Sequence, residues 1–280
     1  MVQMDSRRMC PHCRAFITNK DRTCPYCNES VGTRAIDRRN PAALLGGIIP
    51  HARFTTVVIL VINFGLFLAT ALYSMGAGNG DAFWNIDVGT LVAFGAKYNA
   101  GLAAGQWWRL VTAGFLHGGL LHILMNSWVL FDLGAQVEEI YGAGRMLVIY
   151  FVSTVFGFYA SAVWSPAPSV GASAALMGLI GAMIALGVRD QSSWGADIRR
   201  FYVRWVIYLL VFGLLFPQTD NAAHIGGLGG GFVIGYIAGT PGRSIAMERL
   251  WQVVAGACVA LTAFSFFKMF VQLVAASKAQ

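Results

Sequence analysis

Apolar segments recur along the chain from about residue 55 to residue 275, and this repetition constrains the fold more than any other feature. An α-helix needs about 20 predominantly apolar residues to cross the hydrocarbon layer of a bilayer. We expect membrane spans at residues 55–76, 112–133, 146–164, 171–188, 202–216, 222–239 and 251–275. The sequence therefore predicts an all-α, polytopic transmembrane helical bundle.

The charge content and its distribution agree with a bilayer environment. Charged residues make up 12% of the chain, against about a quarter in ordinary soluble domains. If the N-terminus is cytoplasmic and seven spans alternate, most of the 20 Lys and Arg residues fall on the cytoplasmic side. The positive-inside rule favours this orientation. Basic cytoplasmic loops then account for the net charge of +7, so we expect a multi-pass membrane protein and no nucleic-acid partner.

Four cysteines precede the first span as two Cys-x-x-Cys pairs: Cys10, Cys13, Cys24 and Cys27. Two such pairs supply four thiolates to one tetrahedral zinc ion, and the reducing cytoplasm disfavours disulfides. We predict a structural zinc ribbon in residues 1–33, stabilised by the metal, and a basic linker in residues 34–54. The alternative is a cysteine cluster without metal.

Polar side chains inside membrane spans are costly and mark functional positions. His117, His122 and Asn126 are expected in the second span, and the last two share a helix face. Ser173 lies at the outer end of the fourth span, where free backbone N–H groups gather. His224 lies near the outer end of the sixth span. Taken singly, each residue also fits an interhelical hydrogen bond or, for Ser173, a helix N-cap.

Small residues predict that the fourth and sixth spans pack closely. The two small faces consist of Ala174, Gly178 and Ala182 in the fourth span, and of Gly227 and Gly231 in the sixth. Such faces allow helix backbones to approach closely. We expect this contact to bring Ser173 and His224 within hydrogen-bond reach, about 3 Å.

Four motifs in order carry a resemblance: Trp108-Arg109, then His117 with His122-xxx-Asn126, then Gly171-Ala172-Ser173-Ala174, and Ala223-His224 with Gly227 and Gly231. Glu138 and Gly142 also fit. The chain resembles the rhomboid family of intramembrane proteases over residues 55–239. The resemblance implies a six-span protease core there, with residues 240–280 forming an additional C-terminal span.

The resemblance implies an intramembrane serine endopeptidase that needs no cofactor for catalysis. Ser173 is then the nucleophile and His224 its base, while His122, Asn126 and the backbone N–H of Ser173 form the oxyanion hole. Trp108, Arg109, His117, Gly171, Gly227 and Gly231 are implied to support the structure. The implied partners are transmembrane protein substrates, cut near the outer face of the bilayer in a hydrated cavity open to the extracytoplasmic side.

Two departures from the family pattern stand next to the nucleophile. Many members have glycine where this chain has Ala174, and some have an aromatic residue where it has Met177. The alternative reading is a catalytically weak or inactive rhomboid-like protein that binds membrane clients, although such proteins usually lack the serine or the histidine. A transporter is a second alternative, suggested by glycine-rich spans with buried histidines. The sequence makes no prediction of an oligomeric state.

Overall fold

The computed structural model describes residues 7–10, 12–13, 15–18, 21, 23–29, 31, 53–216, 218–242 and 244–277. The chain divides into two compact units, Met1–Pro50 and His51–Gln280. The predicted linker over residues 34–54 lies outside the described residues apart from Arg53 and Phe54.

The N-terminal unit contains a small antiparallel hairpin. Strand β1 (Arg7–Met9) pairs with β2 (Phe16–Thr18), and Met9 lies opposite Phe16. Its small core consists of Cys10, Ile17, Cys24 and Val31, with Cys27 packed against it. Two of the core positions, Cys10 and Cys24, are cysteines.

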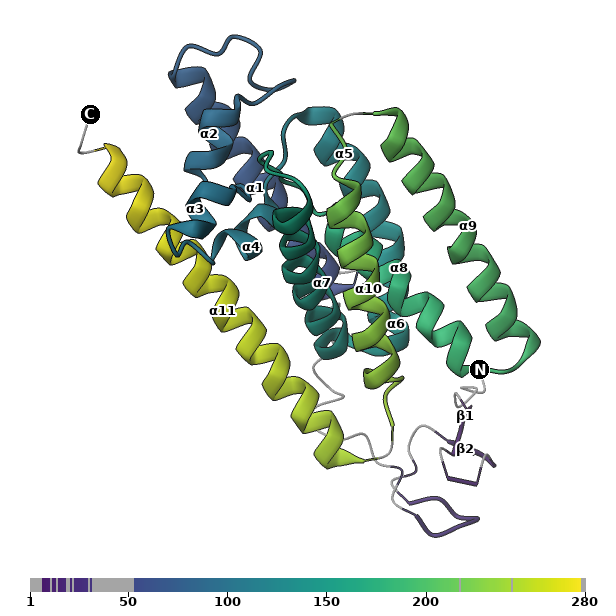
Figure 1. Ribbon diagram of the computed structural model, residues 1–280. Coiled ribbons are helices and arrows are strands. Elements are labelled where there is room, and N and C mark those ends of the chain that lie inside the picture. The colour runs from purple at the N-terminus through teal and green to yellow at the C-terminus, as the bar shows by residue number, and fades with distance from the viewer. Residues whose placement is uncertain are drawn as a thin grey trace, which may run out of the picture. The chain divides into compact units, whose positions relative to one another are not determined.

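The second unit is a helical bundle (Figure 1). Its helices are α1 (Phe54–Gly76), α2 (Val88–Ala93), α3 (Asn99–Ala103), α4 (Arg109–Thr112), α5 (Leu120–Val129), α6 (Ala135–Tyr141), α7 (Ala143–Trp164), α8 (Ser173–Arg189), α9 (Ser193–Leu215), α10 (Asn221–Ala238) and α11 (Ile245–Ser277). Helix α10 packs most extensively on α8 and α7, which also contact each other, while α9 packs on α8 and α11 on α7. Figure 1 shows α9 and α11 on opposite flanks of the bundle.

Several helices suit a bilayer in length and composition. In the described part of the chain, four are long and apolar enough to cross it: Phe54–Gly76, Leu120–Tyr141, Ala143–Trp164 and Ile245–Ala276. Helix α8 is apolar but has 17 residues. Many large apolar side chains of α1, α9 and α11 are exposed, as expected for surfaces that face lipid. The predicted all-α membrane bundle is confirmed.

The second span begins and ends later than predicted. The prediction was 112–133, but α5 begins at Leu120 and continues through a π-helical turn (Leu130–Gly134) into α6, which ends at Tyr141. The cause is a close contact at Gly119, where a Cβ would lie 2.8 Å from the carbonyl carbon of Trp84. This approach holds Gly119 in an extended conformation, and His117 therefore precedes the helix instead of lying in it.

The fifth span, by contrast, starts earlier than predicted. The prediction was 202–216, whereas α9 spans Ser193–Leu215. The side chain of Ser192 accepts a hydrogen bond from the N–H of Gly195 at 3.3 Å and caps the helix. This N-cap begins the helix well before its apolar section.

Two polar contacts fix the outer helices. Glu138 accepts hydrogen bonds from the backbone N–H groups of Thr55 at 3.0 Å and Thr56 at 2.9 Å, and it thereby caps α1 from α6. Arg145 of α7 forms two hydrogen bonds with Glu248 of α11, at 2.7 and 2.8 Å. Because Arg145 is buried, this bidentate pair anchors the C-terminal helix to the bundle.

Candidate active site

The close contact between α8 and α10 builds the candidate site. A Cβ at Gly227 would lie 2.8 Å from the carbonyl carbon of Ala174, and one at Gly235 would lie 2.7 Å from Cα of Ala182. Only glycine allows such backbone approach. Contact positions rise together along the two helices, so α8 and α10 run parallel. The close packing predicted from the small-residue pattern is confirmed.

This register places Ser173 and His224 at the same end of the two helices. Ser173 is the first residue of α8 and immediately precedes Ala174, while His224 lies in the first turn of α10, three residues before Gly227. His224 is buried and Ser173 is partly buried. Among the described residues, Nδ1 of His224 has no hydrogen-bond partner. The end of the helix pair therefore holds a hydroxyl and an imidazole with an uncommitted nitrogen.

A third side chain, that of His122, reaches this end beside Gly171. The N–H of Gly171 donates to the carbonyl of Ala113 at 2.9 Å, and its φ of +133° is rarely adopted by other residues. A Cβ here would lie 2.8 Å from Nε2 of His122 and 3.6 Å from Oγ of Ser173. The imidazole of His122 and the hydroxyl of Ser173 thus face the same point, which glycine leaves open.

His122 and Asn126 project from α5 on one face. Nδ1 of His122 accepts a hydrogen bond from the N–H of Gly118 at 3.4 Å, and Nδ2 of Asn126 donates to the carbonyl of His122 at 3.0 Å. The ring of His117 lies 5.2 Å from that of His122, centroid to centroid. Burial and the neighbouring His122 lower the pKa of His117 to about 3, so this imidazole is neutral at physiological pH.

Trp108 and Arg109 hold the connection between α1 and α5. The guanidinium of Arg109 donates to the carbonyls of Val92 at 2.7 Å and Ala96 at 3.0 Å. It also lies 4.7 Å from the ring centroid of Trp108, a cation–π contact. Both residues are buried in this connection. These contacts hold the backbone of the connection in place, which is a structural role.

Asp220 was not singled out in the sequence, yet it controls the start of α10. Its carboxylate accepts a hydrogen bond from the N–H of Ala223 at 3.0 Å and another from the hydroxyl of Ser161 on α7. Both oxygens are therefore engaged in the helix cap and the interhelical bond. An aspartate directly before an apolar helix is an N-cap signal, and the sequence could have revealed it.

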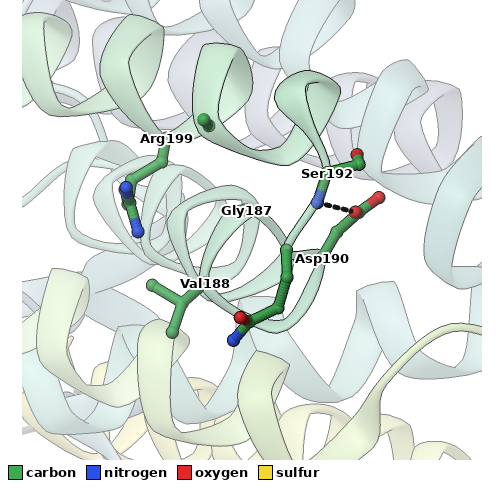
Figure 2. Close-up of a pocket in the computed structure, with 7 residues that line it drawn as sticks. Gly187, Val188, Asp190, Ser192 and Arg199 are labelled. Carbon is green, nitrogen blue, oxygen red and sulfur yellow. Dashed lines mark hydrogen bonds between the residues drawn. The ribbon is translucent and has the colours of Figure 1, made fainter.

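A separate pocket lies at the opposite end of α8 (Figure 2). Its lining includes Gly187 and Val188 from α8 and Arg199 from α9. Hydrogen bonds from Ser192 hold the pKa of Asp190, in the turn between these helices, below its usual value. Because α8 rises about 1.5 Å per residue, this pocket is roughly 20 Å from Ser173. It belongs to the turn and not to the candidate site.

The four cysteines of the N-terminal unit come together. Their sulfur atoms all lie within 4.8 Å of one another, with Cys10 3.8 Å from Cys27 and Cys13 3.6 Å from Cys24. Tetrahedral zinc with Zn–S bonds of about 2.3 Å spaces its sulfurs about 3.8 Å apart. The cluster therefore has the donor set and dimensions of a site that can hold zinc.

Fold and site together define a helical membrane protein with a serine and a histidine at one end of two parallel helices. The sequence matches the family model described as Rhomboid domain over residues 104–241. It is 41% identical over 165 residues to Rhomboid protease GluP of Bacillus subtilis, which covers 59% of this chain and 32% of that protein.

Two further relatives extend the comparison. YdcA, a rhomboid protein of Bacillus subtilis, is 30% identical over 142 residues, or 50% of this chain and 71% of the relative. Rhomboid-like protease 3 of Toxoplasma gondii is 35% identical over 142 residues, or 49% of this chain and 54% of the relative. The chain belongs to the rhomboid family of intramembrane proteases, and it spans about a third of the length of GluP.

Proposed function

We propose that this chain is an intramembrane serine endopeptidase that uses Ser173 as nucleophile and His224 as general base. The observation that carries the proposal is the parallel contact of α8 and α10, which brings both residues to one end of the helix pair. The unpartnered Nδ1 of His224, noted above among the described residues, also supports a catalytic imidazole over a purely structural one.

In this mechanism His224 takes the hydroxyl proton as Ser173 Oγ attacks the scissile carbonyl carbon. The proton then passes to the leaving amine, and water hydrolyses the acyl-enzyme with His224 again as base. Asp220 does not complete a triad here, because among the described residues Nδ1 of His224 has no hydrogen-bond partner, and the carboxylate of Asp220 bonds to Ala223 and Ser161 instead. The dyad acts without an acidic third member.

The oxyanion hole of the proposed mechanism consists of His122, Asn126 and the backbone N–H of Ser173. The convergence of His122 and Ser173 beside Gly171 supports this assignment. A donor of this kind is typically worth about 10²–10³ in rate. One N–H of the Asn126 amide bonds to its own helix, which leaves the second N–H for a bound substrate.

We further propose that the N-terminus is cytoplasmic, that the site opens to the extracytoplasmic side, and that substrates are membrane-anchored proteins. The distribution of basic residues supports the orientation. The four cysteines would hold a structural zinc ion, which would supply cross-linking of the ribbon and take no part in proteolysis.

The test is cleavage of a single-span model substrate by the purified protein in lipid vesicles, together with labelling by a fluorophosphonate, which phosphonylates activated serines. Ser173→Ala and His224→Ala are each expected to lower cleavage about a thousandfold or more. Ser193→Ala is the matched control, because Ser193 is also the first residue of a helix but is exposed. It should retain full activity.

The outcomes separate the candidate functions. Labelling that disappears in Ser173→Ala and persists in Ser193→Ala supports Ser173 as the nucleophile even if the chosen substrate is not cleaved. Neither cleavage nor labelling by the unmodified protein would favour the inactive, client-binding alternative. Cleavage that persists in both Ser173→Ala and His224→Ala would refute the mechanism.

A further inference from the structure

Lys97 is a fully buried lysine in the connection between α1 and α5. A buried ammonium group is costly unless hydrogen bonds or opposite charge compensate it. The groups that compensate Lys97 therefore indicate what its charge holds in place.

The groups that bond to Lys97 lie in residues 165–169, the first part of the connection between α7 and α8. The ammonium of Lys97 donates to the carbonyl of Ser165 at 2.7 Å and to that of Ala167 at 2.8 Å. The backbone of Lys97 also pairs with Ser169, through one hydrogen bond of 2.9 Å and one of 3.0 Å. Four hydrogen bonds thus join this single residue to the segment.

The composition of the segment explains why a lysine is needed. Its sequence, Ser-Pro-Ala-Pro-Ser, has prolines at positions 166 and 168. Proline has no N–H, so the segment has few donors of its own and its carbonyls depend on donors from elsewhere. A charged donor makes stronger hydrogen bonds than a neutral one. Burial lowers the pKa of Lys97, and the nearby carboxylate of Asp220 opposes that shift.

The segment leads directly to the candidate nucleophile. Two residues after Ser169, the N–H of Gly171 bonds to Ala113, and Ser173 begins α8 two residues later. Asp220, whose negative charge raises the pKa of Lys97, caps the helix that carries His224. The position of the segment therefore determines where Gly171 and Ser173 stand relative to the rest of the site.

We propose that Lys97 is a positioning residue, which fixes segment 165–171 so that Ser173 faces His122 and His224. This inference rests on the proposed function of Ser173 as the nucleophile. Lys97 does not touch the reacting atoms; it acts through the carbonyls of Ser165 and Ala167. Because an error of about 1 Å in the position of a reacting group can cost about 100-fold in rate, loosening this segment affects chemistry more than folding.

The experiment compares Lys97→Met with Lys268→Met in the full-length protein in lipid. Lys268 is the matched control because it is an exposed lysine on α11. Three quantities are measured: the rate constant of fluorophosphonate labelling at Ser173, amide hydrogen exchange of residues 165–172, and the thermal unfolding midpoint. Lys97→Met should slow labelling between about 10- and 100-fold and speed exchange at Ser169 and Gly171, while the centres of α8 and α10 stay protected. Lys268→Met should match the unmodified protein.

The outcomes decide between positioning and general stability. Unchanged labelling and exchange in Lys97→Met would overturn the proposal, as would faster exchange throughout the bundle with normal labelling of the folded fraction. Should Lys97→Met not fold, Lys97→Gln keeps neutral N–H donors and should show a smaller loss; a labelling rate equal to that of the unmodified protein would then refute the proposal. Failure of the unmodified protein to label at Ser173 would instead refute the proposed function, and unchanged exchange at 165–172 would still refute the role of Lys97.

Discussion

Gly227→Ala perturbs the contact on which the candidate site depends. A Cβ at this position would lie 2.8 Å from the carbonyl carbon of Ala174, whereas carbon atoms in contact stand about 3.5–4.0 Å apart. The obstructing atoms belong to a helix backbone, so α10 must move away from α8 by about 1 Å. Overpacking of this kind costs about 1–3 kcal/mol, and the higher helix propensity of alanine returns up to about 1 kcal/mol.

The expected result is a loss of about 1–2 kcal/mol in the free energy of unfolding, measured by denaturant titration in bicelles. Fluorophosphonate labelling should slow about 100-fold, because Ser173 and His224 move apart by about 1 Å. Gly229→Ala is the matched control two residues further on, since within the described residues no heavy atom lies within 4 Å of a Cβ there. If the two variants have the same stability and the same labelling rate, the packing argument is wrong.

Three other perturbations test the rest of the structure. Glu138→Gln removes the charged acceptor that caps α1 and should lower the free energy of unfolding by about 1–3 kcal/mol. The control Glu139→Gln, in an exposed ion pair, should lower it by less than about 1 kcal/mol. Equal losses of the two variants in a denaturant titration would contradict the cap. A double-mutant cycle on Arg145→Met and Glu248→Gln should give a coupling energy of about 1–3 kcal/mol, and a value near zero would show that the pair does not anchor α11. Cys24→Ser should remove most of the bound zinc, measured by elemental analysis of the purified protein; an unchanged zinc content would exclude the four-cysteine site.

The sequence was informative where local composition decides the structure. The four-residue spacing of Ala174, Gly178 and Ala182 leaves only small side chains on one face of α8, and the structure places Gly227 of α10 against that face. The same local logic gives the cysteine cluster, because two Cys-x-x-Cys pairs converge whenever the chain between them turns back.

Contacts between distant segments could not be predicted in this way. The start of α5 depends on the close contact of Gly119 with the carbonyl of Trp84, and the hydropathy of the sequence does not indicate that contact. The sequence near Lys97 does not reveal its burial, because the carbonyls that accept from its ammonium belong to the distant residues Ser165 and Ala167. In both cases a contact with the backbone of a distant segment decides the structure, and local hydropathy and charge do not predict it.

The parallel arrangement of α8 and α10 has a chemical consequence for the proposed mechanism. Both helices begin at the same end, and the N–H groups of a first helical turn have no partners within the helix. In α10 the carboxylate of Asp220 accepts from one of them. The corresponding position of α8 is Ala172, whose methyl group cannot accept a hydrogen bond. The first turn of α8, including the N–H of Ser173, is therefore left for an external anion.

In the proposed reaction that anion is the substrate oxygen, which becomes negative where the helix dipole favours it. The unequal capping of two otherwise similar helices thus supports the proposed placement of the base on α10 and of the oxyanion at α8.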